Sequence, residues 1–281
     1  MKINELNETK FGLSNKQRQA YAKKVSTKLD DDVDAALEKY GPQIAVALKA
    51  FKEGRRIFRG VPSEARALLV DPTKVERKAA NTFNYMNIMQ ATLPSWKAYP
   101  RRNRSLICTT SYSTAAAYGF DGRFAVLPFG DPMVGIVPGD DWFRAFAKYG
   151  GPQYVNSNLA NFYASMHEIQ SGFKKPLPET KPQFYEAIKE MDNWRKFHKD
   201  EAEEIMREHP ADNFIKDLMK YPNWIDGLNE LLDPAKNGFK MVPLSKFKPE
   251  RDIEVWISAP ALFIHGDDLM QRFKVDKKSV K

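Results

Sequence analysis

The sequence contains a single cysteine, Cys108, among 281 residues. One cysteine excludes both a disulfide framework and a CxxC metal site. No apolar run approaches the roughly 18 residues that a membrane span needs, and the N-terminal residues lack the apolar stretch of a signal peptide. We therefore expect a cytoplasmic protein, or one that is delivered into a cytoplasm.

The motifs of several common enzyme classes are also missing. The chain has neither GxGxxG nor GxxxxGKS/T, the glycine-rich loops that bind phosphates, and it lacks HExxH and GxSxG. Its four histidines, at positions 167, 198, 209 and 265, are far apart in sequence, which disfavours a metal site. Cys108 lies in an apolar stretch, where a lone cysteine more often packs than reacts.

Positive charge exceeds negative charge, with 44 Lys and Arg against 36 Asp and Glu and a net charge of +8. Such a balance suits an anionic ligand, a nucleic acid or solubility alone. The basic residues are spread along the chain without a Lys/Arg-rich arm, so we do not expect a nucleic-acid partner. The 42% hydrophobic and 12% aromatic content is typical of a globular protein.

The first 54 residues have helical patterns. A basic helix is predicted over about 15–29, and a second helix over about 31–53. Three aspartates precede this second helix, where negative charge suits the helix dipole. Pro42 predicts a break inside it, because proline lacks the N–H that continues a helix.

Strand and helix patterns then alternate in blocks. Short strands are predicted at IFRGVP, SLICTTS, RFAVLPF and MVGIVPG, with helices over about 74–91 and at YSTAAAYG. The turn GDP joins RFAVLPF and MVGIVPG as a hairpin-like pair. Residues 140–233 are mostly helical in pattern, with the clearest helix between Thr180 and Pro210.

Strands return near the C-terminus at GFKMVPLS, DIEVWIS and ALFIHG, and a basic, frayed tail follows them. The regular alternation of strands and helices that a parallel sheet needs is missing. The pattern therefore predicts an α+β fold with a mainly antiparallel sheet.

Two polar features lie at the ends of predicted strands. Arg59 and Gly60 close the first strand, where a guanidinium can hold a phosphate and glycine permits close approach of a ligand. Thr109, Thr110 and Ser111 follow a second strand and precede a helix. Their hydroxyls can orient a ligand, or they can cap the helix, which is the commoner use.

A third feature is the segment DIEVWI, which alternates polar and apolar residues. Alternation with period two places Asp252, Glu254 and Trp256 on one face of the predicted strand. Two carboxylates on a strand face are more often solvated than catalytic, and a tryptophan beside them is more often packing. Taken singly, none of the three features establishes a site.

In this order the three features resemble the motifs of the R-S-E class of mono-ADP-ribosyltransferases, which carry an aromatic-Arg-Gly, an S-T-S and an E-x-E sequence. The matching segments are Phe58-Arg59-Gly60, Thr109-Thr110-Ser111 and Asp252-Ile253-Glu254. The resemblance covers about residues 55–145 and 238–266. The stretch from RNRSLICTTS to VGIVPGDDWF is also similar to phage-encoded members, including some that virions carry.

The resemblance implies a split antiparallel β core of the ADP-ribosyltransferase type, with N-terminal helices and a helical insertion. The implied organisation is an N-terminal helical region at 1–54, a catalytic domain at 55–266 and a basic tail at 267–281. The insertion occupies about 145–235 and has no counterpart in the family that we can place. An insertion of this size could select the partner protein.

The resemblance further implies transfer of ADP-ribose from NAD+ to a side chain of a target protein, arginine being one acceptor. Glu254 then stabilises an oxocarbenium-like transition state, as carboxylates do in glycoside hydrolysis. Asp252 assists the acceptor, and Arg59 binds the diphosphate. The other motif residues complete the NAD+ site, Thr109 by orienting Glu254. They are Gly60, Thr109, Thr110 and Ser111.

Two motifs depart from the family pattern. The triplet is TTS, for which Cys108-Thr109-Thr110 is an alternative alignment, and the acidic pair is DxE where the family has ExE or QxE. The expected partners are NAD+ and a target protein in a host cell, and no membrane partner is expected. The protein would reach its target in the host cytoplasm after delivery from a virion. The alternatives are hydrolysis of NAD+ alone, an inactive structural virion protein with this fold, and an anion- or nucleic-acid-binding protein whose binding would depend steeply on salt.

Overall fold

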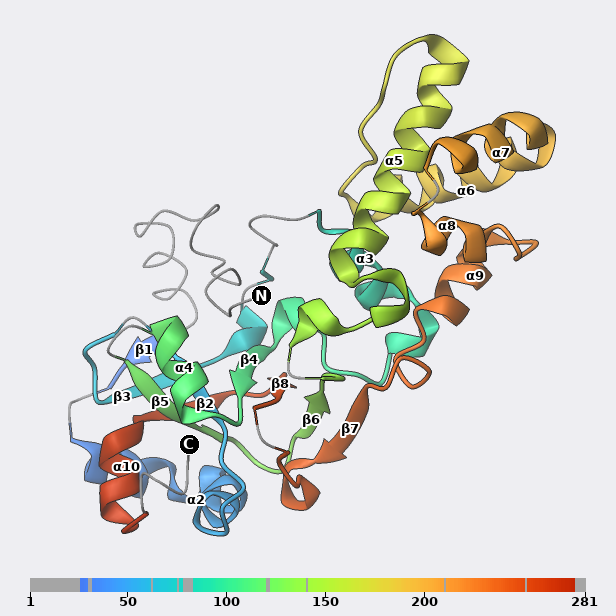
Figure 1. The fold of residues 1–281 in the computed structure, drawn as a ribbon. Coiled ribbons are helices and arrows are strands. Elements are labelled where there is room, and N and C mark those ends of the chain that lie inside the picture. The colour runs from blue at the N-terminus through green and yellow to red at the C-terminus, as the bar shows by residue number, and fades with distance from the viewer. Residues whose placement is uncertain are drawn as a thin grey trace. The chain divides into compact units, whose positions relative to one another are not determined.

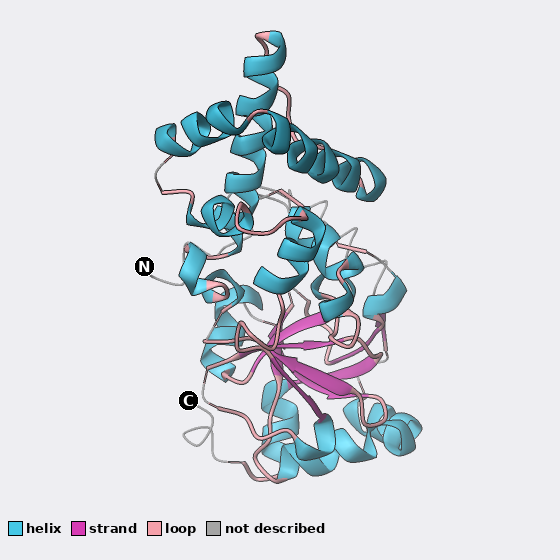
Figure 2. Ribbon diagram, turned by 90° about the vertical axis from the view of Figure 1, so that its right-hand side faces the viewer, coloured by secondary structure: helices cyan, strands magenta, loops and turns pink. Residues whose placement is uncertain are grey.

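The computed structural model describes residues 26–29, 32–61, 63–74, 76–77, 83–119, 122–139, 141–209, 211–250 and 252–275. The chain divides into two compact units (Figure 1). The sheet unit comprises residues 1–81, 99–141 and 240–281, and the helical unit comprises residues 82–98 and 142–239. All strands of the described residues belong to the sheet unit (magenta in Figure 2).

The described strands of the sheet unit form one antiparallel sheet in the order β1-β3-β9-β5-β2-β4-β8-β6-β7. The α+β class and the antiparallel sheet that the sequence predicts are therefore confirmed. The strands are β1 (Ser26–Lys28), β2 (Phe58–Gly60), β3 (Ala67–Val70), β4 (Leu106–Thr109), β5 (Arg123–Pro128), β6 (Met133–Ile136), β7 (Lys240–Pro243), β8 (Glu254–Ile257) and β9 (Ala261–His265).

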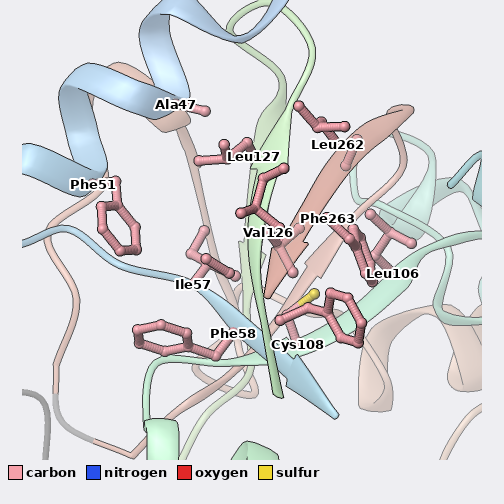
Figure 3. Close-up of a cluster of buried hydrophobic side chains, with 14 of the residues drawn as sticks. Ala47, Phe51, Ile57, Phe58, Leu106, Cys108, Val126, Leu127, Leu262 and Phe263 are labelled. Carbon is pink, nitrogen blue, oxygen red and sulfur yellow. The ribbon is translucent and has the colours of Figure 1, made fainter. Parts of the chain in front are cut away.

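Three described helices belong to this unit: α2 (Val33–Lys52), α4 (Tyr112–Gly119) and α10 (Gly266–Arg272). Helix α2 buries a face that includes Ala47 and Phe51 against the strands. Figure 3 shows these two side chains beside Leu127 of β5 and Ile57, which precedes β2. Burial of such apolar surface, at about 25 cal/mol per Å², is the main force that holds the helix on the sheet.

Strands β2 and β4 share the fewest paired residues of any neighbouring strands in the described sheet. Over the described residues these two strands pair only at Phe58 and Thr109, whereas β2 pairs with β5 at three positions and β4 with β8 at four. The sheet thus has a five-stranded part that ends at β2 and a four-stranded part that begins at β4. This split positions the residues of the candidate site.

The helical unit contains α3 (Tyr85–Thr92), α5 (Pro152–Ser171), α6 (Lys181–Phe197), α7 (Lys199–Glu208), α8 (Asn213–Leu218) and α9 (Trp224–Leu231). Its core is rich in aromatic rings. Phe162 of α5 packs on Trp194 of α6 and Trp224 of α9, with ring centroids 6.2 and 5.1 Å away. None of the helices in the described part of the chain is long and apolar enough to cross a membrane.

The helical unit differs from the predicted insertion at one point. Residues 82–98, which contain α3, belong to it as well as residues 142–239. The side chain of Tyr85 in α3 stacks on Phe184 of α6 and donates a hydrogen bond to the Leu177 carbonyl at 2.7 Å. The predicted helix over about 74–91 is confirmed from Tyr85, where α3 begins, and is wrong at residues 76–77 and 83–84, which are not helical; residues 75 and 78–82 of the prediction lie outside the described residues.

The N-terminal prediction needs two corrections. Residues 26–28, predicted near the end of a basic helix, form the edge strand β1, which pairs with β3, and residue 29 is not helical; residues 15–25 of that prediction lie outside the described residues. A three-residue polar strand is held by backbone pairing and carries no alternation signal. Helix α2 is continuous through Pro42, since Asp32 caps its start and its buried face packs on the sheet.

The predicted hairpin between RFAVLPF and MVGIVPG is also wrong. Strand β5 lies between β9 and β2, and β6 lies between β8 and β7. The linking residues bind elsewhere, because Phe129 N–H donates to the Pro260 carbonyl and Gly130 N–H to the Gln43 carbonyl. These bonds carry the chain from the first part of the sheet to the second.

Two further elements differ from their predictions. The long helix between Thr180 and Pro210 is two helices, α6 and α7, which meet at His198, where the backbone leaves the helical region and the imidazole stacks on Trp194. The basic tail assigned to 267–281 begins inside helix α10 (Gly266–Arg272); fraying was predicted for residues 271–281, of which 276–281 lie outside the described residues. Leu269 and Met270 of α10 are fully buried.

Candidate functional site

The structure brings three candidate residues to three consecutive strands. Arg59 lies in β2, Thr109 ends β4 and Glu254 begins β8. These residues are about 50 and 145 positions apart in the sequence. Their order in the sheet, β2-β4-β8, places Thr109 between the arginine strand and the glutamate strand.

Thr109 and Glu254 lie directly opposite each other in the β4–β8 ladder. Directly opposed residues project to the same face, with Cβ atoms about 5 Å apart. The side chain of Thr109 is 9% exposed and that of Glu254 13% exposed. The two side chains are therefore neighbours on a largely buried stretch of the sheet.

Cys108 faces the other way. It lies opposite Val255, and burial raises the pKa of its thiol to about 12 despite the nearby positive charge of Arg59. A thiol that holds its proton is a poor nucleophile. The alignment that begins at Cys108 puts this thiol in the position of the first serine of the family triplet, on the face away from Glu254, so the geometry favours the alignment that begins at Thr109.

The carboxylate of Glu254 contacts two groups that the structure places beside it. The indole N–H of Trp256 donates to Oε1 at 2.5 Å, and the Nε atom of Arg102 lies 3.7 Å from the same oxygen. Trp256 is 1% exposed and shares a strand face with Glu254, as the alternation predicts. Both contacts act on one oxygen and so restrict the orientation of the carboxylate.

Arg59 lies at the split between the two parts of the sheet. Phe58, its neighbour, lies opposite Thr109, so strand alternation directs Arg59 to the other face of β2. Its guanidinium donates to the carbonyl of Ile107 in β4. Arg59 thus bridges β2 and β4 just where their backbone pairing ends, and Gly60 follows it opposite Arg123 of β5.

The hydroxyls of the triplet bind the protein itself. The Thr109 hydroxyl accepts from Ser111 N–H at 3.1 Å, and the Ser111 hydroxyl accepts from Thr114 N–H at 3.1 Å, which caps α4. The Thr110 hydroxyl donates to the Glu250 carbonyl at 2.9 Å and accepts from Ile253 N–H at 3.1 Å. Ser111 and Thr110 therefore shape the backbone around Thr109 and Glu254.

Asp252 does not share a strand face with Glu254, and this part of the sequence interpretation is wrong. Strand β8 begins at Glu254, and Asp252 has a φ of +58°, a left-handed conformation that few residues other than glycine adopt. Its exposed carboxylate accepts a hydrogen bond from the Thr114 hydroxyl of α4 at 3.0 Å. The left-handed residue breaks the alternation that the sequence implied.

Sequence reasoning missed Arg102. It lies in a turn of 3-10 helix at Arg102–Arg104, just before β4. The only signal was the basic run RRNR, which reads as a solvated turn and has no spacing that points to a carboxylate 152 positions later. Groups of three or more His, Cys, Asp or Glu that could hold a metal ion do not occur among the described residues.

Comparison with known proteins gives no relative. No protein-family model matches the chain, and no curated protein or solved structure matches it. The antiparallel α+β architecture stands on the structure alone, while the ADP-ribosyltransferase-like fold stays a prediction based on the three motifs.

Proposed function

We propose that the protein transfers ADP-ribose from NAD+ to a side chain of a target protein. One observation carries the proposal. Three motifs that are far apart in the sequence lie on three consecutive strands, and two of their polar residues, Thr109 and Glu254, are directly opposed. An accidental match of short motifs has no reason to place Thr109 directly opposite Glu254, with Arg59 on the next strand.

In the proposed reaction, the bond between ribose C1′ and the nicotinamide nitrogen breaks, and nicotinamide leaves with the bonding electrons. Positive charge develops on the ribose, and the Glu254 carboxylate stabilises it because the two charges are close in a largely buried place. The acceptor then forms a bond to C1′ and loses its proton to the carboxylate of Asp252 or to water. The anionic diphosphate pairs with the guanidinium of Arg59.

Thr109 supports Glu254 in this proposal by lying opposite it on the neighbouring strand. Thr110 and Ser111 act one step further away, since their hydroxyls fix the loop before β8 and the start of α4. Gly60 keeps the end of β2 free of a side chain beside Arg59. Asp252, exposed on the loop before β8, meets the acceptor, and its negative charge suits an arginine.

The test measures nicotinamide release and transfer of labelled ADP-ribose to proteins of a cell lysate. We expect Glu254→Gln to lower the rate by on the order of 100- to 1000-fold, the usual effect of removing one charged group that stabilises a transition state. Glu250→Gln is the matched control, because Glu250 is an exposed carboxylate in the same segment and pairs with Lys240 at 3.7 Å. Wild-type protein that neither releases nicotinamide nor transfers label would refute the proposal.

A second candidate is a structural protein that has this site architecture without catalysis. The observation that favours it is that several motif side chains bind the protein: Arg59 holds a β4 carbonyl, Thr110 holds the loop before β8, and Ser111 caps α4. This candidate predicts no activity in the wild type and a loss of stability in Arg59→Ala. The activity assay above distinguishes the two.

A further inference from the structure

The turn that carries Arg102 is anchored to the end of the glutamate strand. The hydroxyl of Ser105 donates to the Arg101 carbonyl at 2.7 Å and shares a hydrogen bond of 2.6 Å with the hydroxyl of Ser258. Ser258 directly follows β8, whose first residue is Glu254. Two bonds from one side chain thus fix residues 101–105 relative to the strand that bears the carboxylate.

A second arginine, Arg77, binds the backbone carbonyls of the same turn. The backbone N–H of Arg77 donates to the Asn103 carbonyl at 2.8 Å, and its guanidinium donates to the carbonyls of Arg102, at 3.0 Å, and Ser105. Three bonds from one residue to three successive parts of a turn leave the turn little freedom to move. The side chain of Arg102 is consequently presented from a rigid backbone.

One oxygen of the carboxylate has a hydrogen-bond donor and a cation beside it. Trp256 donates to Glu254 Oε1 from within β8, and Arg102 lies 3.7 Å from that oxygen. Arg102 and Glu254 expose only 15% and 13% of their side chains, so solvent screens this ion pair less than one on the surface. The backbone beside Trp256 is also tightly packed, since a Cβ at Gly135 would lie 3.3 Å from Pro100.

We propose that Arg102 is a positioning residue, which together with Trp256 holds one oxygen of Glu254 so that the carboxylate faces the ribose in a single orientation. The catalytic consequence rests on the proposed function. The placement of the carboxylate does not, because it follows from contacts within the sheet unit. A displaced carboxylate loses transition-state stabilisation more than it loses substrate binding.

The kinetic test uses Arg102→Gln, which removes the charge and keeps much of the length. We expect kcat for nicotinamide release to fall on the order of 100-fold, the cost of misplacing a catalytic group by about 1 Å. The KM for NAD+ should change by less than about threefold, since the lost interaction acts mainly in the transition state. Arg102→Lys keeps the charge and should therefore recover about tenfold of the lost kcat. The recovery should be incomplete because lysine lacks the planar fork of arginine.

Arg104→Gln is the matched control. Arg104 belongs to the same turn, is about half exposed and pairs with Glu76 at 3.2 Å. This variant removes the same charge from the same turn, so it should leave kcat unchanged. An equal fall of kcat in both variants, or an effect of Arg102→Gln on KM alone, would overturn the positioning role.

A spectroscopic measurement separates this inference from the proposed function. The indole N–H of Trp256, identified in a ¹H–¹⁵N spectrum by its loss in Trp256→Phe, reports on the Glu254 carboxylate to which it donates. Its resonance should shift in Arg102→Gln and stay in place in Arg104→Gln. This result is expected even if the wild type has no activity, and an unmoved resonance in Arg102→Gln contradicts the inference.

Discussion

The sheet unit and the helical unit differ in charge as much as in fold. The sheet unit has 30 Lys and Arg against 21 Asp and Glu, and the helical unit has 14 against 15. The whole excess of positive charge therefore belongs to the unit that also holds every candidate site residue. A positive field raises the local concentration of an anionic substrate, and a dinucleotide diphosphate is such a substrate.

The two units also have cores of different kinds. The sheet unit buries strand residues and one face each of α2, α4 and α10, whereas the helical unit buries aromatic rings such as those of Phe162, Trp194 and Trp224. The buried cluster of the sheet unit, over the described residues, consists of residues of that unit. If each unit is held by its own core, a core mutation in one unit should leave the other unit intact, and mutations can test this expectation.

The largest expected effect comes from Phe162→Ala. Phe162 is 1% exposed and contacts two tryptophans, so its truncation should cost the helical unit about 3–5 kcal/mol of stability. Hydrogen exchange read by mass spectrometry should show faster exchange in α5, α6 and α9 and unchanged exchange in β4 and β8. Phe124→Ala, in the core of the sheet unit, should give the reverse pattern. Equal loss of protection in both units after either change would show that they unfold as one.

A smaller effect is expected from Ser111→Ala. The Ser111 hydroxyl caps α4 by accepting from Thr114 N–H, and removal of such a cap costs about 1 kcal/mol. The comparison is Thr180→Ala at the start of α6 in the helical unit, where the hydroxyl bonds the Gln183 side chain instead of the backbone. Urea denaturation should show a loss of about 1 kcal/mol in the free energy of unfolding for Ser111→Ala and a change below about 0.5 kcal/mol for Thr180→Ala. A cost for Thr180→Ala as large as that for Ser111→Ala would contradict the assignment of the stabilisation to the hydrogen bond from Thr114 N–H.

The smallest effect concerns pH. Hydrogen bonds from Lys148 and Lys220 lower the pKa of Asp217, in the helical unit, to about 2. Because its folded pKa lies below the unfolded value of about 3.9, Asp217 stabilises the folded unit above about pH 4. This contribution is lost as the pH falls from about 4 to about 2. It should stay below about 1 kcal/mol because both lysines are largely exposed.

The measurement is the stability of wild type and Asp217→Asn between pH 5 and pH 2, by urea denaturation followed at aromatic signals. The two proteins should converge as the pH falls below about 4. Asp226→Asn, which removes an exposed carboxylate of the same unit, is the control for the loss of one negative charge. A wild type that stays more stable than Asp217→Asn down to pH 2 would contradict the assignment.

The sequence predicts the elements of the sheet unit better than their neighbours. The strands at β4, β5, β8 and β9 are apolar runs with clear ends, and helix α4 follows its threonine-serine cap, so local pattern is enough to find them. Which strands lie side by side is a long-range property. The hairpin prediction failed because backbone bonds of Phe129 and Gly130 divert the chain between the two parts of the sheet.

The candidate site divides in the same way. Arg59, Thr109 and Glu254 were found from short motifs and do lie on consecutive strands. Asp252 was wrongly placed on the strand face of Glu254, because the local sequence does not reveal that its backbone is left-handed. Arg102 escaped notice because its partner is fixed by tertiary bonds, through Ser105, Ser258 and Arg77, and not by any sequence spacing.

The order of strands also has a consequence for synthesis of the protein. Strands β8 and β9 come from residues 254–265, yet β8 lies between β4 and β6, and β9 lies between β3 and β5. A ribosome that has made the first 240 residues has therefore produced four strands whose pairing edges still lack their partners, and such edges invite aggregation. Premature stop codons late in the message should yield insoluble chains, and the glutamate that we assign to the chemistry arrives only with the strand that completes the sheet.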